Sequence, residues 1–400
     1  MSAAARTADA GSPVAINPPW LFTAEHLEWR EKVRDFVDRE LAPTVAERTV
    51  ERHFADELIP RIGAEGFFGV RISEEYGGLG KDLTSQCIML EEFARVDGSV
   101  CNIIEAGSVV GTLVEAMASD EQRRGYLPRL ARGESIAAFG LTEPHGGSDA
   151  GNMWTRARRD GDDWLIDGAK DQISTLSSAV SEHVIVFAAT GEGKAPERPA
   201  ITAFMVPLDA PGITLGERYA KIGWVASDVR RIDFDGVRVP DSAVLGEPGR
   251  GYADALNLVT WARLAIASMA TGVIQGCLDA TLATVRERES FGRPVGEHQD
   301  AAFKVSRIIA KLAVARGLTY DGCYRFDHGH DYGRQASVAK LIAARLANEV
   351  AFDAVELAGA TGLLETSAVA RLYGDARVLT IGEGPEAVQK MLIARSLGLR

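Results

Sequence analysis

Strand-like sequence is confined to the middle of this chain, between two long stretches with helical patterning. At residues 20–132 apolar side chains recur at helical spacing. The clearest set is Val33, Phe36, Val37 and Leu41. Residues 140–240 instead hold short β-branched and aromatic runs, and the chain after Gly251 is helical again. Helices, then strands, then helices indicate an α+β fold, and they exclude the alternating βαβ sheet of a Rossmann nucleotide site.

Local signals place individual elements within this plan. Asp160-Gly161 between two extended runs predicts a β-hairpin, and further strands are predicted at 184–187, 201–206 and 232–234. Ser119 and Gln122 have the spacing of a capping box, which predicts that a helix begins there.

Bulk properties exclude several classes of protein. The net charge is −12 and the pI is near 5.2, which argues against nucleic-acid binding because phosphate neutralisation needs a basic face. The four cysteines form no Cys-x-x-Cys pair and predict neither disulfides nor a zinc site. Residues 1–19 lack the apolar core of a signal peptide and are predicted to be a disordered tail. No apolar run approaches the length of a membrane span, so a reducing cytoplasmic setting is expected.

The most distinctive short segment is residues 141–150, Leu-Thr-Glu-Pro-His-Gly-Gly-Ser-Asp-Ala. Adjacent glycines, a proline and short hydroxyl side chains allow a sharp bend that exposes backbone N–H groups on one side. Such a surface suits a flat polar ring or a phosphate, and a plain solvent-exposed turn is the simpler alternative.

The pattern Leu-Thr-Glu-Pro-x-x-Gly-Ser-Asp at 141–149 resembles the signature loop of the acyl-CoA dehydrogenase family, the flavoproteins that desaturate acyl thioesters. Other motifs of this family occur in the family's order along residues 20–395. They are Ser119-Asp120-Glu121-Gln122 with Tyr126-Leu127-Pro128, Trp164-x-Ile166-Asp167-Gly168-x-Lys170, Val237-x-Val239-Pro240 with Leu245-Gly246 and Gly251, Arg288-x-x-Phe291-Gly292 with Gln299, Gly359-x-x-Gly362, and Glu383-Gly384. Ordered matches of this kind are far more specific than any single motif.

The resemblance implies an architecture and a set of partners. It implies an N-terminal helical domain at 20–137, a middle β-barrel or sandwich domain at 138–250 and a C-terminal four-helix bundle at 251–400. It further implies FAD as the cofactor, an acyl-CoA or acyl-carrier-protein thioester as the substrate, and an electron-transfer flavoprotein as the acceptor. The family's usual dimer of dimers predicts a homotetramer.

The chemistry of α,β-desaturation defines what the site must contain. Removing hydrogens from Cα and Cβ of a thioester needs a base for the α-proton, donors for the carbonyl oxygen and a hydride acceptor. No side chain accepts a hydride, so a flavin is required. The base should be a carboxylate in an apolar pocket, where desolvation raises its pKa toward the working pH.

Glu383 matches the family's base position and is the predicted catalytic base. The neighbouring Gly382 and Gly384 let a ligand approach the backbone closely and are predicted, with Ser148, to contact the substrate. A solvated loop glutamate is the alternative. Arg263 lies in the apolar segment 258–265, predicted to be helical, where a charge must be paired or functional. It is either a structural ion pair or a substrate-site group near Glu383.

The resemblance assigns a further set of residues to FAD. It implies contacts from the hydroxyls of Thr142 and Ser148 and from the backbone of Phe139 and Leu141, for which turn capping is the alternative. Ile173 and Ser174 match the strand beside the isoalloxazine ring. The residues that match the site of the adenine-diphosphate half, shared with a neighbouring subunit, are Arg288, Phe291, Gln299, Glu356, Gly359 and Ala360.

Four positions depart from the family pattern. Gln172 and Gly382 replace common aromatic residues, Pro385 replaces a Thr or Ser, and Glu356 replaces a glutamine and sets a negative charge near the expected FAD phosphates. These departures indicate a specialised branch and leave an oxidase that uses O₂ open. A same-fold flavin monooxygenase is a second alternative, although such enzymes generally lack the carboxylate base. The acyl group, its length and the choice of carrier stay open. The pair His328 and His330 is predicted to lie in a loop and to bind no metal.

Overall fold

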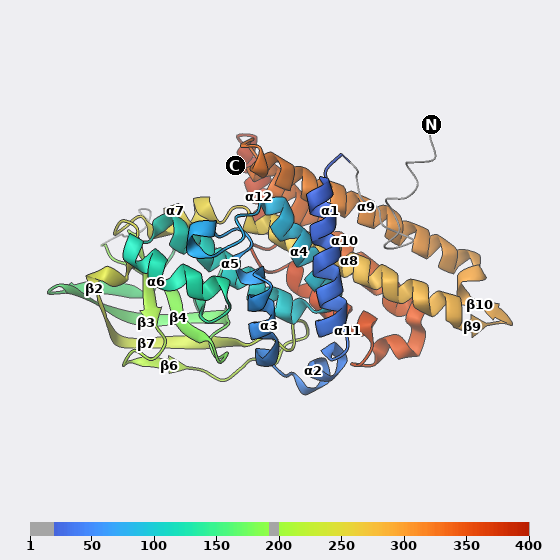
Figure 1. Cartoon of the computed structure of the whole chain (residues 1–400), viewed down its shortest axis with the longest axis horizontal. Helices are drawn as coiled ribbons and strands as arrows, with labels where there is room; N and C mark the ends of the chain where they lie inside the picture. Colours follow the sequence, from blue (N-terminus) through green and yellow to red (C-terminus); the bar gives the residue numbers. More distant parts are fainter. Residues whose placement is uncertain (1–19, 192–199, 400) are drawn as a thin grey trace. The chain divides into compact units, whose positions relative to one another are not determined.

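The computed structural model describes residues 20–191 and 200–399, so the predicted tail at 1–19 lies outside the described residues. Within them the chain forms two units. The first unit holds residues 20–50, 83–98 and 263–399, and the second holds 51–82 and 99–262. Helices fill the first unit, whereas the second combines a large sheet with shorter helices (Figure 1).

The first unit is held together by helices that share apolar faces. Its elements are α1 (Ala24–Phe36), η2 (Val37–Leu41), α2 (Val45–Glu51), α4 (Leu83–Val96), α8 (Ala262–Glu287), α9 (Gln299–Asp327), α10 (Gly333–Ala358), η8 (Gly359–Leu363), α11 (Ala368–Leu379) and α12 (Glu386–Ser396). The predicted apolar face of α1 and η2 is confirmed, because Val33, Phe36, Val37 and Leu41 are all buried. Helix α1 packs against α4, and α10 packs against α9, α11 and α12.

Charged side chains are also buried between these helices. Glu91 of α4 accepts hydrogen bonds from Arg30 of α1 (Nη1–Oε1, 3.1 Å), from Arg316 of α9 (Nε–Oε1, 3.1 Å) and from the Tyr320 hydroxyl (2.6 Å). Gln275 of α8 accepts from the same Arg316 at 3.1 Å. One carboxylate thus joins α1, α4 and α9, and Arg316 extends the network to α8.

The second unit contains an eight-stranded sheet in the order β6-β7-β3-β2-β4-β5-β8, with β1 paired in parallel to β4. The strands are β1 (Ile136–Gly140), β2 (Arg156–Asp160), β3 (Asp163–Ser174), β4 (Ser181–Ala189), β5 (Ile201–Pro207), β6 (Ile213–Leu215), β7 (Val229–Pro240) and β8 (Val244–Leu245). The predicted hairpin is confirmed, since Asp160 pairs with Asp163 and Gly161 in the turn has φ +65°. The predicted strands at 184–187, 201–206 and 232–234 lie within β4, β5 and β7.

Several short helices and one long helix precede and follow this sheet in the second unit. The short ones are η3 (Asp56–Leu58), α3 (Ile59–Ala64), η4 (Phe67–Gly69), η5 (Glu74–Tyr76), α6 (Asp120–Ala131), η6 (Asp241–Ala243) and α7 (Gly251–Leu258), and the long one is α5 (Gly98–Met117). The predicted capping box is present at the start of α6, where Ser119 and Gln122 exchange hydrogen bonds. The Gln122 amide also donates to the Ser242 carbonyl at 2.8 Å, which ties α6 to the end of the sheet.

Two helices are longer and more apolar than the sequence patterning indicated. By length and hydropathy α5 and α8 could each cross a membrane, which corrects the expectation that no apolar run approaches that length. Of the apolar stretch of each helix, 72% of α5 and 89% of α8 is buried inside the protein. Burial of this extent is that of core helices, which meet the same criteria of length and composition.

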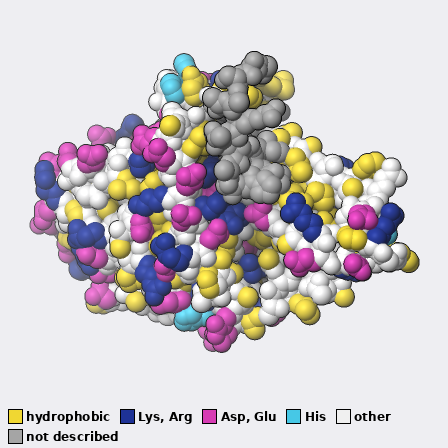
Figure 2. Space-filling view, turned by 45° about the vertical axis from the view of Figure 1, so that its right-hand side comes forward, with side chains coloured by type: hydrophobic (Ala, Val, Ile, Leu, Met, Phe, Trp, Pro, Cys, Tyr) yellow, Lys and Arg dark blue, Asp and Glu magenta, His cyan; other side chains and the backbone are white. Residues whose placement is uncertain are grey.

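Charges of both signs are mixed on the surface. On the face that Figure 2 shows, lysine and arginine side chains alternate with aspartate and glutamate, and no single-sign patch gathers there.

Candidate functional site

The loop at 141–149 follows the buried strand β1 in the second unit. Its Thr142 carbonyl accepts a hydrogen bond from Asp171 N at 2.9 Å, which joins the loop to β3. Gly147 and Ser148 are exposed, and a Cβ on Gly147 would lie 3.3 Å from Thr142 Cγ2. Among the residues that the structure describes, the hydroxyls of Thr142 and Ser148 have no hydrogen-bond partner. The loop therefore presents free hydroxyls beside a glycine that keeps them accessible, and this donor set fits a flavin or a phosphate.

A buried ion pair holds this loop in shape. Glu143 accepts from Trp154 N (2.7 Å), Thr155 N (2.9 Å) and the Lys170 ammonium of β3 (2.8 Å). Burial raises the pKa of Glu143, but the Lys170 charge and these hydrogen bonds outweigh burial and hold the pKa below its usual range. Burial lowers the pKa of Lys170, and Glu143 offsets only part of that effect.

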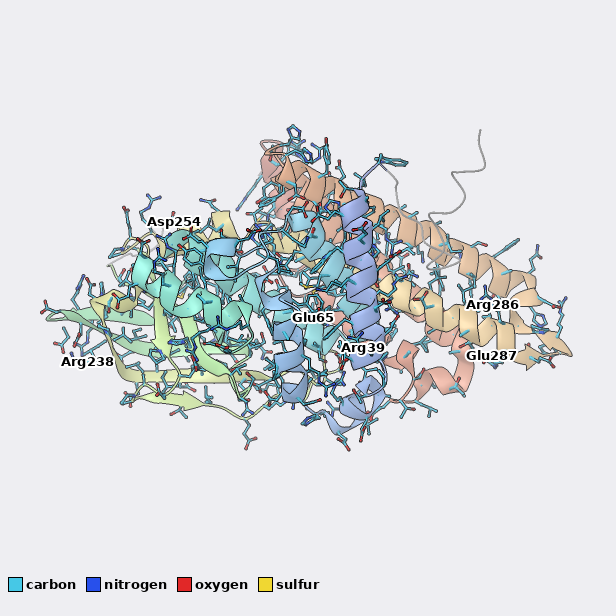
Figure 3. The ribbon with its side chains drawn as sticks, viewed as in Figure 1. Arg39, Glu65, Arg238, Asp254, Arg286 and Glu287 are labelled. Atoms are coloured by element: carbon cyan, nitrogen blue, oxygen red, sulfur yellow. The ribbon has the colours of Figure 1, made fainter. Side chains whose placement is uncertain are left out.

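We expect Lys170→Met to destabilise the protein by about 3–5 kcal/mol, because it leaves a buried carboxylate without its counter-ion. The matched control is Arg238→Met on β7, whose guanidinium pairs with Asp163 at 3.0 Å on the exposed surface (Figure 3). That change should cost far less, because water screens an exposed ion pair. Urea unfolding of both variants measures the difference, and equal losses would contradict a special role for the buried pair.

The predicted strand residues beside the loop lie at an irregularity of the sheet. The β3–β7 register shifts between Lys170 and Ile173, and Gln172 at the shift is exposed with φ +59°. Ile173 is buried, whereas Ser174 is half-buried. The bulge turns the Gln172 side chain to solvent, at the position where the family commonly has an aromatic ring.

Glu383 lies in the first unit, in the segment between α11 and α12. Its φ is +50° and that of Gly384 is +87°, so two consecutive residues adopt the left-handed region. For glutamate this conformation costs free energy and persists only where neighbouring groups impose it. Pro385 stands at the N-cap of α12 and offers no capping side chain, and the Gln389 amide instead donates to the carbonyls of Glu383 and Gly384, each at 2.9 Å.

The surroundings of the Glu383 carboxyl favour its protonated form. Burial among protein atoms raises its pKa, while the charges of Arg263 and Lys340 lower it by less, so the pKa lies above its usual range. The residue is nevertheless exposed to water. The two observations are compatible, because desolvation also depends on protein atoms beyond the water-accessible surface.

Arg263 is placed near Glu383, as one of the two sequence interpretations expected. The prediction of one continuous helix over 258–265 was wrong, because α7 ends at Leu258 and α8 begins at Ala262. Arg263 therefore lies in the first turn of α8, where the helix dipole does not favour a cation. Burial lowers its pKa and Glu383 raises it. The carboxylate of Glu383 is thus its main favourable electrostatic partner.

The residues predicted to bind the adenine-diphosphate half come together around the C-terminus of α10. Arg288 donates to the carbonyls of Leu357 (3.2 Å) and Ala358 (3.0 Å), and a Cβ on Gly359 would lie 2.6 Å from its Nη1. Gln299, the first residue of α9, is exposed. The chain from Gly359 through Ala360 forms η8.

The structure corrects the expectation for Glu356 and adds an observation on Phe291. Glu356 does not carry an uncompensated negative charge, because Lys304 of α9 pairs with it at 2.8 Å. Phe291 is 99% exposed, and with Gly292 it forms the tip of the hairpin between β9 (Glu289–Ser290) and β10 (Arg293–Pro294). Both tip residues have positive φ, as a two-residue hairpin turn of type I′ requires.

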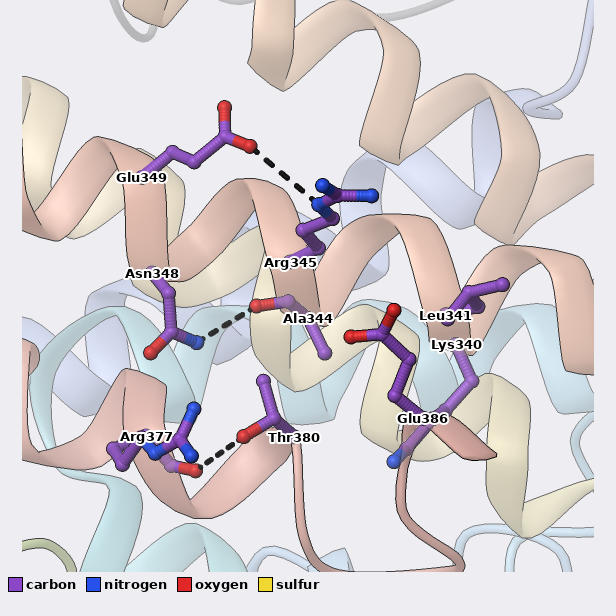
Figure 4. Close-up of a pocket in the computed structure, with 9 residues that line it drawn as sticks. All are labelled: Lys340, Leu341, Ala344, Arg345, Asn348, Glu349, Arg377, Thr380 and Glu386. Carbon is purple, nitrogen blue, oxygen red and sulfur yellow. Dashed lines mark hydrogen bonds and ion pairs between the residues drawn. The ribbon is translucent and has the colours of Figure 1, made fainter. Parts of the chain in front are cut away.

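Two further features, a pair of histidines and a cavity, lie apart from the predicted site residues. His328 and His330 lie between α9 and α10, and the described residues contain no cluster of metal-binding side chains. A cavity of about 190 Å³ opens in the first unit between α10 and the segment that leads into α12 (Figure 4). None of the predicted site residues lines it, but Lys340 does.

Sequence reasoning missed the residues that hold the predicted groups in place. These are Lys170 and Glu143 behind the loop, and Lys340 and Gln389 behind Glu383. A weak signal was available for Lys340, since a lysine within Ser337-Val338-Ala339-Lys340-Leu341 interrupts an alanine-rich helix face.

The chain is similar to known proteins along most of its length. The chain matches the N-terminal, middle and C-terminal domains of acyl-CoA dehydrogenases at residues 23–134, 138–237 and 249–398. A 3-(aryl)acrylate reductase from Clostridium sporogenes is 34% identical over 94% of this chain and 99% of its own length. Among solved structures, butyryl-CoA dehydrogenase from Megasphaera elsdenii superposes with a TM-score of 0.89 at 30% identity, covering 94% of this chain and 98% of that one. The prolyl acyl carrier protein oxidase AnaB gives 0.88 at 25%, covering 94% and 100%.

The fold and the three matched domains define a flavoprotein oxidoreductase that acts on CH–CH bonds. The chain belongs to the acyl-CoA dehydrogenase family.

Proposed function

We propose that this protein desaturates an acyl thioester between Cα and Cβ, with Glu383 as the base that takes the α-proton. The proposal rests on the surroundings and the backbone conformation of Glu383. A carboxyl group with a raised pKa, accessible to water and fixed by a strained backbone, has the properties of a general base tuned toward neutral pH.

FAD, when bound, supplies the hydride acceptor that no side chain provides. The residues proposed to hold it are Phe139, Leu141, Thr142 and Ser148 of the loop, Ile173 and Ser174 of β3, and the cluster of Arg288, Phe291, Gln299, Glu356, Gly359 and Ala360. The free hydroxyls of Thr142 and Ser148 support this assignment. For the substrate we propose Ser148, Arg263, Gly382 and Gly384, with the Glu383 N–H donating to the thioester carbonyl.

The protein is further proposed to be a cytoplasmic homotetramer that passes electrons to an electron-transfer flavoprotein. A phenyl ring that is 99% exposed at a hairpin tip supports assembly, since a neighbouring subunit would cover Phe291. An oxidase that uses O₂, or an acyl-carrier-protein substrate, is the second candidate. It is favoured by the likeness to a prolyl acyl carrier protein oxidase and by the exposed Gln172 in place of an aromatic ring.

An anaerobic absorbance titration of the purified yellow protein tests the proposal. We expect at least one member of an acyl-CoA panel to bleach the flavin band, and the best member defines the acyl length. Acyl-carrier-protein thioesters form the second arm, and reoxidation by air against an electron-transfer flavoprotein separates oxidase from dehydrogenase. A flavoprotein that no thioester of either carrier reduces would contradict the proposal.

A further inference from the structure

We propose that Lys340 is a positioning residue for the catalytic base: together with Gln389 it holds the backbone carbonyls of Glu383 and Gly384, and thereby fixes where the Glu383 carboxyl group lies. The inference rests on the proposed function, because positioning matters only if Glu383 acts as the base. Neither residue is assigned to the reaction by the family motifs described above.

Lys340 makes a specific contact with the segment that carries Glu383. The side chain leaves the N-terminal third of α10 and runs toward the connection between α11 and α12 (Figure 4). Its ammonium donates to the Gly384 carbonyl at 2.6 Å, and the residue is only 1% exposed. Burying an ammonium is costly, and burial lowers the pKa of Lys340 to about 8. A buried cation aimed at a single loop carbonyl indicates a role for that loop.

The loop needs such a restraint because its conformation is unfavourable on its own. Glu383 and Gly384 both have positive φ, which an unrestrained glutamate rarely adopts. Gln389 supplies the second restraint from the first turns of α12, and its Nε2 lies 2.9 Å from where a Cβ on Gly384 would be. Side chains from two helices therefore bind two consecutive carbonyls. The Glu383 carbonyl accepts from the Gln389 amide, and the Gly384 carbonyl accepts from both the Gln389 amide and the Lys340 ammonium.

The two cations near Glu383, Lys340 and Arg263, act on it in different ways. Lys340 faces Glu383, Glu386 and Arg263, and Arg263 faces Glu383 and Tyr332. Within the described part of the chain Arg263 makes no hydrogen bond to the Glu383 segment, so it acts on the carboxyl through its charge alone. Lys340 acts through both its charge and its hydrogen bond. Loss of Lys340 should therefore displace the carboxyl and also weaken the stabilisation of its ionised form.

The variant Lys340→Met removes the ammonium and keeps most of the side-chain volume. We expect the rate of flavin reduction at saturating acyl thioester to fall about 10- to 100-fold, with little change in substrate affinity, because a displaced base slows proton transfer more than binding. The rising limb of the pH–rate profile should also move to higher pH, since a lost positive charge makes the carboxylate harder to form. A purely structural lysine would change neither the pH limb nor the balance between rate and affinity.

Three companion variants and one independent readout complete the test. Lys311→Met removes a lysine that bridges α9 to Glu349 of α10 at 3.1 Å and should leave the rate unchanged. Gln389→Met removes the second restraint without a charge, so it should slow reduction while the pH limb stays in place. If Lys340→Met fails to fold, Lys340→Ala is used with added alkylamines, which can enter the cavity that Lys340 lines and restore the rate. Amide hydrogen exchange at residues 381–385 should accelerate in Lys340→Met and not in Lys311→Met.

The outcomes separate this inference from the proposed function. A wild-type protein that no thioester reduces refutes the proposed function, while hydrogen exchange still tests whether Lys340 holds the loop. The positioning role would be overturned if Lys340→Met reduced its flavin at the wild-type rate, or if amide hydrogen exchange at residues 381–385 were unchanged in this variant. Either result would do so even if Glu383 proves to be the base.

Discussion

Replacing Glu383 with glutamine should slow flavin reduction by acyl thioesters by about 10²–10⁴-fold, the range that loss of a general base produces. Glutamine keeps the size and polarity of the side chain but cannot accept the α-proton. The backbone restraints from Lys340 and Gln389 do not depend on the carboxyl group, so the loop should keep its shape. Stopped-flow bleaching of the flavin absorbance band measures the rate constant.

The control for this substitution is Glu365→Gln, which alters an exposed carboxyl group in the same C-terminal region and should retain the wild-type rate. In the wild type the rate should rise with pH through the elevated pKa of Glu383, because only the carboxylate accepts a proton. That rising limb should be absent in Glu383→Gln. Bleaching at the wild-type rate in Glu383→Gln would remove Glu383 from the mechanism.

The same variant has an expected effect on stability. Between the ordinary carboxyl pKa and the raised pKa of Glu383, the folded protein holds a proton that the unfolded chain has released. Wild-type stability therefore falls as pH rises through this window, whereas glutamine contributes no such loss. Thermal unfolding should show Glu383→Gln gaining on the wild type as the pH rises from acid to neutral. A constant difference between the two proteins across this range would contradict the raised pKa.

Replacing Glu91 with alanine should destabilise the first unit by about 3–5 kcal/mol, as large a loss as we expect for Lys170→Met. The change leaves Arg316 and Arg30 buried and removes the acceptor shared by α1, α4 and α9. Arg30 keeps Glu92 at 2.8 Å, whereas the contact of Arg316 with Gln275 at 3.1 Å supplies no negative charge. Chemical denaturation measures the loss.

Asp321→Ala is the matched control for Glu91→Ala, because Asp321 pairs with Arg325 at 3.0 Å on the surface of α9, the helix that also carries Arg316. It should cost less than about 1 kcal/mol. Equal losses in Glu91→Ala and Asp321→Ala would contradict the importance of burial.

The buried carboxylates also predict acid sensitivity. Burial raises the pKa of Glu92, but Arg34, Arg30 and Arg95 lower it to about 2, so its contribution is complete above the ordinary carboxyl pKa and is lost as pH falls toward 2.

Periodicity and turn signals determined the sequence of elements. The buried face with Val33 and Leu41, the Ser119 capping box and the hairpin at Gly161 were all predicted, because each depends on residues within a few positions of one another. The break between α7 and α8 was not predicted, since the apolar run across Val259 has no glycine or proline to mark it. The expectation that no apolar run approaches the length of a membrane span also needed correction, since the buried helices α5 and α8 are long and apolar enough by composition.

The sequence by itself determined the family, the loop at 141–149 and the nomination of Glu383, because these are carried by ordered motifs and by the chemistry a thioester requires. Only the tertiary structure decided what holds those groups. Lys340 reaches Gly384 across 44 positions of the chain, Lys170 reaches Glu143 across 27, and Lys304 neutralises Glu356 across 52. Burial, and with it the pKa of each group, depends on which distant segments pack around a side chain. Local patterns contain no record of that packing, so it becomes visible only in the folded chain.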